Sequence, residues 1–182
     1  MKGVVFTEFL TFIESQFDLA MVDHLITATQ PASGGAYTAV GTYEASELVA
    51  MVVELSQRSG ETVPNLVKAF GEHLFNHFAT SHADTMGDVH SAEELLSSVE
   101  SRIHVEVRKL FPDAELPTIG FQKMDERTSE VLYQSSRPFA DLCEGLIAAA
   151  IKHFQDPITL TREDLPPHDG THAKFVMARE TE

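Results

Sequence analysis

Three side chains in the stretch VLYQSSRPF, residues 131–139, could together bind a ligand with two negative charges. Tyr133, Ser135 and Arg137 occupy alternate positions, so in a β-strand they would share one face and span about 13 Å. Pro138 disfavours helical geometry at Arg137, which predicts that the strand stays extended as far as the arginine. Two hydroxyl groups and a guanidinium suit a flat molecule with two carboxylates on one edge. The plainer interpretation is a polar strand face that meets water.

Histidines are the candidates for metal ligands, because the only cysteine, Cys143, excludes an internal disulfide and a cysteine-rich zinc site. His104 follows Ile103 at the edge of an apolar stripe, where its imidazole could face a buried cofactor. A histidine at such a position can equally be a hydrogen-bonded core residue. Its environment in the fold must decide between the two.

A second pair of histidines suggests an alternative metal site. His73 and His77 lie four residues apart, on one face of an expected helix, with Glu72 nearby. The motif is neither HExxH nor its inverted form, which favours surface histidines over a zinc hydrolase. With no nucleophile beside a base and no phosphate-binding glycine loop, we expect no enzymatic activity.

The composition excludes two classes of partner. The 182-residue chain has 28 acidic and 13 basic residues and a formal charge of −15, whereas binding nucleic acid or an anionic membrane needs clustered Lys and Arg. The N-terminal stretch MKGVVFTEFLTFIESQF carries one lysine and is interrupted by Glu8 and Glu14, unlike a signal peptide or a membrane-spanning helix. We therefore expect a cytoplasmic globular protein with a sizeable core.

Helical periodicity dominates the first 110 residues. Expected helices run from about Val5 to Phe17, over residues 18–29, from about Leu48 to just before Gly60, and from about Pro64 to Thr80. The runs PASGGAYTAVGT and SHADTMGDVH read as loops. Ser91 and Glu94 have capping-box spacing before one further helix that Pro112 stops. Its apolar stripe consists of Leu96, Val99, Ile103, Val107 and Leu110.

In the second half of the chain, the spacing of apolar residues changes from a helical pattern to one typical of extended strands. LPTIGFQKM and SEVLYQSSR are expected to form a hairpin with a turn at about residues 125–128, and ITLTRE and HAKFVMAR two more strands. Between the hairpin and these two strands, a long helix is expected from Pro138. Its buried side would consist of Phe139, Leu142, Leu146, Ile147, Ala150 and Phe154. The predicted fold class is α+β. We expect one domain, with a helical N-terminal subdomain (1–60) packed on a small antiparallel sheet with helices (61–182).

The sequence as a whole resembles a known family. Its start at MKG, the segment AFGEHLF, the helix with His104, and YQSSR followed by FADLCEGL are similar to those of H-NOX domains. These haem nitric oxide/oxygen-binding proteins are bacterial relatives of the haem domain of soluble guanylate cyclase. The resemblance covers nearly all of the chain. It implies haem b (iron protoporphyrin IX) buried between the two subdomains.

The resemblance also assigns roles around the haem. His104 would be the proximal iron ligand, and Tyr133, Ser135 and Arg137 would hold the two propionates. Pro117 falls where the family has a proline that presses on the porphyrin and bends it. A Leu-Pro pair is also common where a loop leads into a strand, without any role in ligand binding.

On the opposite side of the haem, the matching positions predict which gas binds. Family members that bind O2 stably have a tyrosine where this chain has Leu142, and a polar residue where it has Leu74. The rest of the pocket would be formed by Val5, Phe9, Phe78 and Leu146. Bound O2 needs a hydrogen-bond donor and NO does not, so a wholly apolar pocket favours NO and CO.

The resemblance implies a gas sensor rather than an enzyme. Stand-alone family members act on separate signalling proteins, often histidine kinases or cyclic-di-GMP enzymes, and such a protein is the expected partner. Some relatives carry a zinc site of three cysteines and a histidine near the C-terminus; LTREDLPPHDGTHAK has no cysteine, so that site is not expected. An O2-binding member of the family, and a haem-free domain that binds a hydrophobic ligand or a protein, stay open as alternatives.

Overall fold

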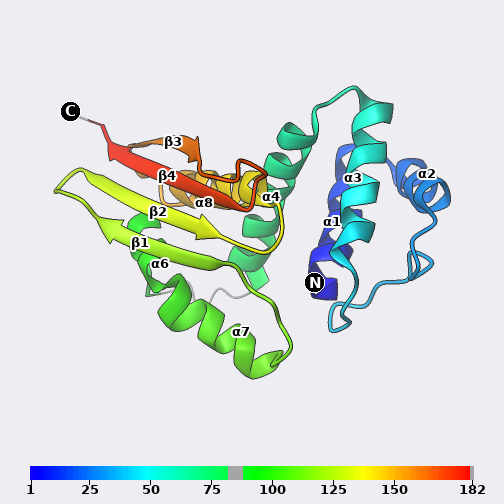
Figure 1. The fold of residues 1–182 in the computed structure, drawn as a ribbon, viewed down its shortest axis with the longest axis horizontal. Helices are drawn as coiled ribbons and strands as arrows, with labels where there is room; N and C mark the ends of the chain where they lie inside the picture. The colour runs from blue at the N-terminus through cyan, green and yellow to red at the C-terminus, as the bar shows by residue number, and fades with distance from the viewer. Residues whose placement is uncertain (82–87, 181–182) are drawn as a thin grey trace.

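The structure, a computed structural model, describes residues 1–81 and 88–180. Figure 1 shows three helices on one side of helix α4 (Val63–Ser81) and a four-stranded sheet with further helices on its other side. The first group contains α1 (Gly3–Gln16), α2 (Leu19–Thr29) and α3 (Ala45–Ser59). The predicted mixed helix-and-sheet class is confirmed.

Aromatic packing joins the first group to α4. The apolar stripe of α1 points inward as predicted, except that Phe17 lies beyond the helix and is exposed. The ring of Phe9 meets that of Phe70 in α4 edge-on, with centroids 5.2 Å apart. Burying each phenylalanine contributes about 1.5–3 kcal/mol to folding, so this cluster holds α1 firmly against α4. The buried residues of α1 are Gly3, Phe6, Phe9, Phe12 and Ile13.

The ends of these helices follow local rules. Asp18 caps α2 by accepting a hydrogen bond from the backbone N–H of Met21 at 2.8 Å. Gly60 ends α3 in the left-handed region with φ +80°, as its position predicted. The run PASGGAYTAVGT forms the loop between α2 and α3, whereas residues 82–87 of the second predicted loop lie outside the described residues.

The helix that carries His104 is not one regular α-helix. It consists of α6 (Ala92–Ser98), a π-helical turn η1 (Val99–Ile103) and α7 (His104–Leu110). Ser91 caps α6 as predicted, accepting from the N–H of Glu94 at 3.1 Å. The predicted continuous apolar stripe is wrong at its end, because Leu110 is 71% exposed while His104 is only 8% exposed. The π-turn adds a residue to one turn, which rotates the buried face away from the regular period.

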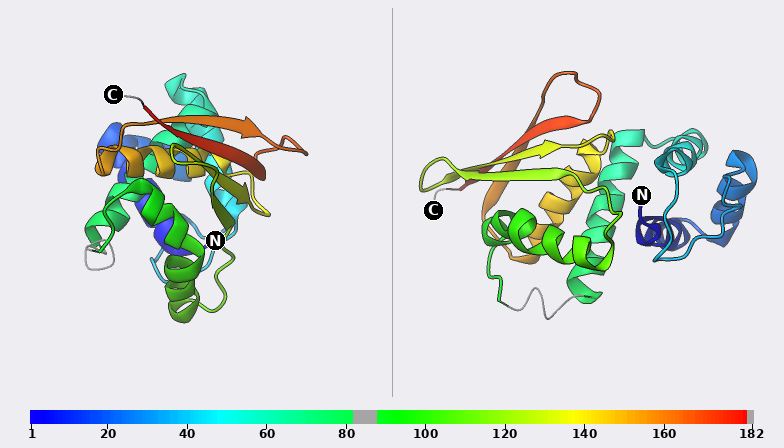
Figure 2. Two further views of the ribbon diagram at one scale, coloured as in Figure 1. Left: turned by 90° about the vertical axis from the view of Figure 1, so that its left-hand side faces the viewer. Right: turned by 60° about the horizontal axis from the view of Figure 1, so that its bottom comes forward.

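The four strands form an antiparallel sheet in the order β1-β2-β4-β3. The predicted hairpin is present: β1 (Thr118–Lys123) pairs with β2 (Thr128–Gln134), and Asp125 closes the turn by accepting from the N–H groups of Arg127 and Thr128. Strands β3 (Ile158–Asp164) and β4 (His172–Arg179) complete the sheet. Helix α6 packs against β1, and α8 (Ala140–His153) against β3 and β4 (Figure 2).

Helices α4 and α8 cross unusually closely, at two glycines. A side chain at Gly71 would collide with the carbonyl oxygen of Leu142, and one at Gly145 with that of Lys68. The face of α8 that packs inward is therefore made of small residues together with Ile147. Leu142, Leu146 and Phe154 lie on the core side of α8 as predicted, but they are only partly buried there.

None of the helices in the described ranges 1–81 and 88–180 combines the length and apolar character needed to span a bilayer.

Candidate functional site

His104 has the environment of a metal ligand. It is buried at the start of α7, and its Nδ1 lies 2.9 Å from Oε1 of Glu100. Its Nε2 has no hydrogen-bond partner among the described residues. No fully buried polar side-chain atom in the described part lacks a partner, so Nε2 reaches accessible space. A histidine with one nitrogen tied to a carboxylate and the other free is typical of metal sites.

Electrostatics keep this pair in the states that ligation needs. Burial lowers the pKa of His104, although the hydrogen bond and charge of Glu100 partly oppose this shift. Burial raises the pKa of Glu100, but hydrogen bonds from the Ile119 N–H and from His104 lower it by more, so the pKa lies below its usual value. At neutral pH His104 is therefore neutral and Glu100 ionised. The proton then sits on Nδ1, and the lone pair of Nε2 is available.

Sequence reasoning missed both Glu100 and the π-turn. The N–H of His104 bonds to the carbonyl of Val99, five residues back, which closes the π-turn directly before His104. Such turns are rare and occur often at functional sites. The spacing of Glu100 and His104, four residues apart on a helix, was the available signal for the pair.

The prediction of an extended row formed by Tyr133, Ser135 and Arg137 is wrong. Strand β2 ends at Gln134, and the chain then turns instead of remaining extended. Ser135 Oγ accepts from the N–H of Arg137 at 3.1 Å, and Tyr133 donates its hydroxyl to the carbonyl of Arg137 at 3.2 Å. The local bond of the serine hydroxyl outcompetes the extended conformation that Pro138 favours. Burial raises the pKa of Tyr133, so its hydroxyl stays a donor.

This turn still presents the guanidinium of Arg137. Its side chain bonds both the backbone carbonyl, at 3.1 Å, and the carboxylate of Glu115. Arg137 is 18% exposed, whereas the side chain of Glu115 is 71% exposed. Because the Glu115 carboxylate faces solvent, the carboxylate of a ligand could replace it on this partly buried arginine.

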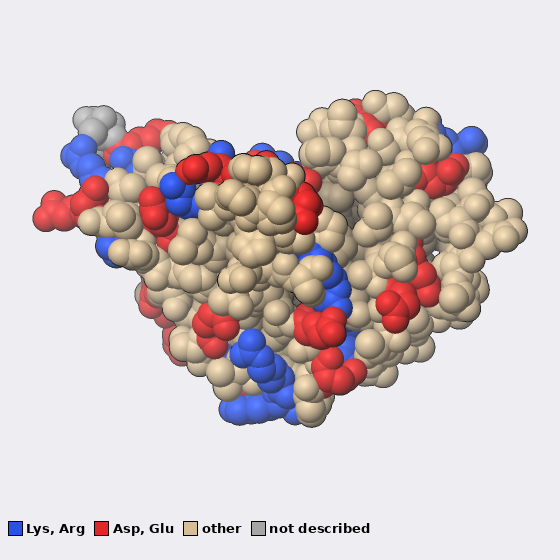
Figure 3. All heavy atoms as spheres, in the orientation of Figure 1, with Lys and Arg blue, Asp and Glu red and all other residues tan. Residues whose placement is uncertain are grey.

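A hollow beside Arg137 is large enough for part of an organic ligand. Its volume is about 420 Å³, in the range of small-molecule sites. The N-terminal ammonium of Met1 donates to the carbonyl of Tyr43 at 2.7 Å at its edge, and burial followed by the charge of Arg137 lowers the pKa of that ammonium. On this face of the molecule, basic and acidic side chains gather where the helical group meets the sheet group (Figure 3). The hollow is lined by Met1, Lys2, Thr42, Tyr43, Glu44, Ala45, Ser46, Asp113, Ala114, Glu115 and Arg137.

Six apolar side chains singled out in the sequence come from three helices. Val5 and Phe9 lie on α1, Leu74 and Phe78 on α4, and Leu142 and Leu146 on α8. Phe9 and Leu74 are buried, and the other four are partly buried against the same core. Partly covered apolar side chains beside a core favour an apolar ligand that would complete their burial. Pro117 lies directly before β1, two residues from Ile119.

The alternative metal pair does not form a metal centre. His73 Nε2 and His77 Nδ1 both approach Oε2 of Glu8 on α1, at 3.3 and 3.0 Å. Among the residues that the structure describes, no three His, Cys, Asp or Glu side chains are arranged to hold a metal ion. These contacts join α1 to α4 instead.

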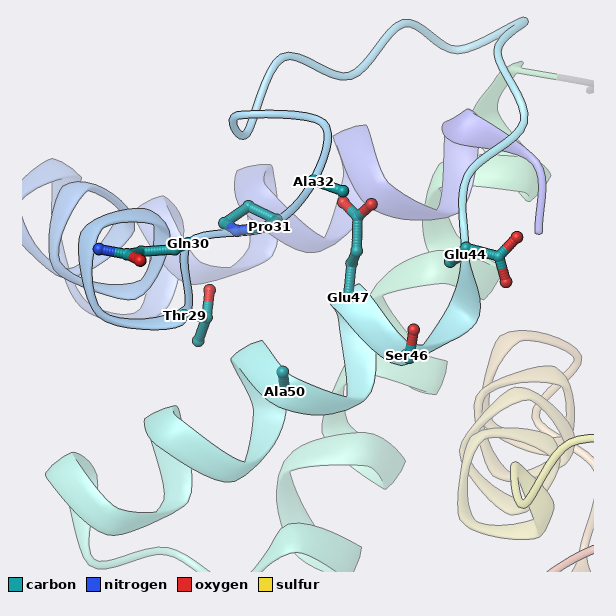
Figure 4. A pocket seen from close by; sticks show the side chains of 8 residues that line it. All are labelled: Thr29, Gln30, Pro31, Ala32, Glu44, Ser46, Glu47 and Ala50. Carbon is teal, nitrogen blue, oxygen red and sulfur yellow. The ribbon is translucent and has the colours of Figure 1, made fainter.

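A second hollow of about 270 Å³ lies between the end of α2 and the start of α3. Figure 4 shows Glu47 pointing towards Ala32 and Glu44 pointing away from the hollow. The carboxylate of Glu47 is already bonded by the hydroxyls of Ser33 and Tyr37, at 2.6 and 2.8 Å. None of the predicted site residues lines this hollow, although it shares Glu44 and Ser46 with the hollow beside Arg137.

Comparisons with known proteins agree with this arrangement. The model of the family described as Haem-NO-binding matches residues 2–162. The structure of an Fe(II) unliganded H-NOX protein from K. algicida is 35% identical, with a TM-score of 0.92 over 100% of this chain and 98% of that one. An H-NOX protein from S. oneidensis in the Fe(II)NO state is 27% identical, with a TM-score of 0.90 over 100% of both chains. A further similar structure is the IWP-051-bound H-NOX from Shewanella woodyi in the Fe(II)CO state, 35% identical, with a TM-score of 0.82 over 99% of this chain and 95% of that one. No curated protein matches the chain.

Proposed function

This chain belongs to the Haem-NO-binding (H-NOX) family of haem-based gas sensors, and from that premise we propose that it is an NO-selective sensor whose iron ligand is His104. The single observation that carries the proposal is the state of His104. It is buried and neutral, its Nδ1 is held by Glu100, and its Nε2 is unpaired and accessible. A neutral imidazole with a free nitrogen is the ligand that a ferrous haem needs from the protein.

The residues present fit both the iron and the propionates of haem b. When bound, haem would supply an iron that His104 could ligate and that could take up a diatomic gas. Arg137 would hold a propionate in place of the Glu115 carboxylate that it bonds now. Tyr133 and Ser135 would support that contact by fixing the turn that presents Arg137. We assign the porphyrin-facing positions to Pro117 and to the six apolar side chains.

Gas selectivity follows from the same six side chains. None of Val5, Phe9, Leu74, Phe78, Leu142 and Leu146 carries an N–H or O–H group that could donate to bound O2. Bound NO needs no such donor, so these helices favour NO, and CO, over O2. The S. oneidensis structure with Fe(II)NO is support by similarity at 27% identity.

In this proposal, gas binding is transmitted through the movement of two subdomains. Residues 1–60 would form the helical subdomain and residues 61–182 the haem-anchoring subdomain of one domain. Movement of His104 would shift the proximal helix relative to α1 and α4, a two-state change that another protein could read. We propose a separate cytoplasmic signalling protein as that reader, such as a histidine kinase or a cyclic-di-GMP enzyme.

The proposal is tested by haem reconstitution of three proteins: wild type, His104→Ala and His73→Ala. Under nitrogen the reduced wild type and His73→Ala should give the same five-coordinate ferrous spectrum, while His104→Ala should lose it. His73→Ala is the matched control, because it removes a partly buried histidine from the alternative pair. Loss of the spectrum in His73→Ala alone would contradict the assignment. Failure of the wild type to take up haem would favour the haem-free interaction domain.

A further inference from the structure

We propose that Glu100 is a positioning residue that fixes His104 for the iron and ties it mechanically to strand β1. This inference rests on the proposed function, since it concerns the ligand of the haem, but part of it is testable without haem. Nothing in the composition or the apolar periodicity points to Glu100. The inference comes from the hydrogen bonds around its carboxylate.

One oxygen of Glu100 serves two donors from different elements. Oε1 accepts from Nδ1 of His104 at 2.9 Å and from the backbone N–H of Ile119 at 2.8 Å. The other oxygen lies 3.8 Å from the guanidinium of Arg108, an outer contact between exposed side chains. The shared oxygen therefore forms a bridge between the π-turn and the first residues of β1.

The first consequence concerns His104 itself. An ionised carboxylate accepts but does not donate, so it holds the proton of the neutral imidazole on Nδ1 and leaves the lone pair on Nε2. The negative charge also raises the basicity of the ring and so strengthens its bond to a metal. With haem bound, Glu100 would therefore strengthen the bond between His104 and the iron.

The second consequence concerns the sheet. Ile119 is buried and pairs with Tyr133 across β1 and β2, and the Tyr133 hydroxyl bonds the carbonyl of Arg137. A displacement of His104 thus acts through Glu100 on Ile119 and then on the turn that presents Arg137. The chain of contacts joins the two polar ends of the proposed haem site without passing through the haem.

The substitutions Glu100→Gln and Glu100→Leu separate charge from hydrogen bonding. Glutamine keeps an oxygen that can accept from Ile119 but loses the negative charge, and leucine removes both functions. The matched control is Glu106→Gln, a glutamate six residues along the same helical segment whose partner is the exposed Lys109. Far-ultraviolet circular dichroism would establish that each variant is folded.

The haem-free arm of the test is nitrogen-15 NMR of the His104 ring. We expect Nδ1–H in wild type and in Glu106→Gln, and a mixture of the two tautomers in Glu100→Leu. Wild-type tautomers in Glu100→Leu would overturn the positioning role. This arm gives its answer even if the chain binds no haem, so failure here is distinct from failure of the proposed function.

The haem-loaded arm is resonance Raman spectroscopy of the iron–histidine stretch in the reduced, gas-free protein. Both Glu100 variants should shift the stretch to lower frequency, and the equilibrium for losing His104 in the NO complex should increase by about tenfold, the lower end of the effect of removing such a partner. Glu106→Gln should match wild type. An unchanged stretch and an unchanged NO complex in Glu100→Gln would overturn the role of the charge.

Discussion

The two sides of the proposed haem site are built by opposite means. The polar side, formed by the π-turn, β1 and the turn after β2, consists of hydrogen bonds: His104 to Glu100, Glu100 to Ile119, and Tyr133 to Arg137. The apolar side, formed by α1, α4 and α8, consists of close-packed side chains and a glycine crossing. One side achieves specificity by placing polar groups in fixed positions, and the other achieves it by excluding them.

The largest effect is expected from a disturbance of the apolar side, through Gly145→Ala. The added methyl group would collide with the carbonyl oxygen of Lys68, so α4 and α8 must separate. We expect a loss of about 3 kcal/mol in the free energy of unfolding, as for an overpacked core. Urea unfolding of the haem-free protein measures this. Gly120→Ala is the control, because a methyl group there meets only Leu132 at ordinary contact distance, 3.5 Å.

A smaller effect is expected on the polar side from Arg137→Ala. Loss of a charge-assisted contact to a propionate should weaken haem binding by about 2 kcal/mol, or about 30-fold. The rate of haem transfer to excess apomyoglobin measures the change. Glu115→Ala should act in the opposite direction, because it removes the carboxylate that competes for the guanidinium. Faster haem loss in Glu115→Ala would contradict the stand-in role of that carboxylate.

A substitution of Glu93 would measure how much its hydrogen bonds and ion pairs stabilise the polar side. Burial raises its pKa, but hydrogen bonds from Lys123, Ser129 and Arg179 lower it to about 2. Because the folded-state pKa is depressed, its stabilisation is present above the unfolded value of about 4.5 and is lost as the pH falls towards 2. Glu93→Gln should therefore cost about 1.5 kcal/mol at pH 7 and progressively less below pH 4.5.

Denaturant titrations of wild type and Glu93→Gln across this pH range would show whether the two stability curves converge at low pH. Glu94→Gln is a control from the same turn, where the carboxylate bonds only the exposed N–H of His90. Parallel curves at every pH would contradict the role of the ionised Glu93.

The smallest effect is expected from a donor added to the apolar side, by Leu142→Tyr. A hydroxyl near the gas should stabilise bound O2 by about 1 kcal/mol, which is roughly fivefold in its dissociation rate. Leu142→Phe is the matched control, with a ring of similar size and no donor. Equal O2 binding by the two variants would show that the missing donor is not what sets selectivity.

The two sides also differ in how far the sequence predicted them. The apolar side depends on helical periodicity, so the buried positions of α1, such as Phe6 and Phe9, followed from spacing. The end of α3 at Gly60 and the hairpin turn at Asp125 followed from local backbone chemistry in the same way. Family resemblance added His104 and Arg137, which periodicity alone would have left as boundary and surface residues.

The polar side was harder to predict because its decisive features are tertiary. A π-turn leaves no mark in an apolar pattern, so the exposure of Leu110 was not foreseen. The second donor to Glu100 comes from Ile119, nineteen residues away, and only the fold brings it there. The turn at Ser135 reflects a hydroxyl bond that competes with strand geometry, and propensities do not rank that competition.

The most direct test of NO selectivity is the visible absorption spectrum of the reduced, haem-loaded wild-type protein, first under nitrogen, then with NO and, on a separate sample, with air. We expect a five-coordinate ferrous spectrum that shifts with NO and forms no stable O2 complex in air. A stable oxygenated spectrum in air would contradict the account of the apolar side, and an unchanged spectrum with NO would contradict the proposed sensing function itself.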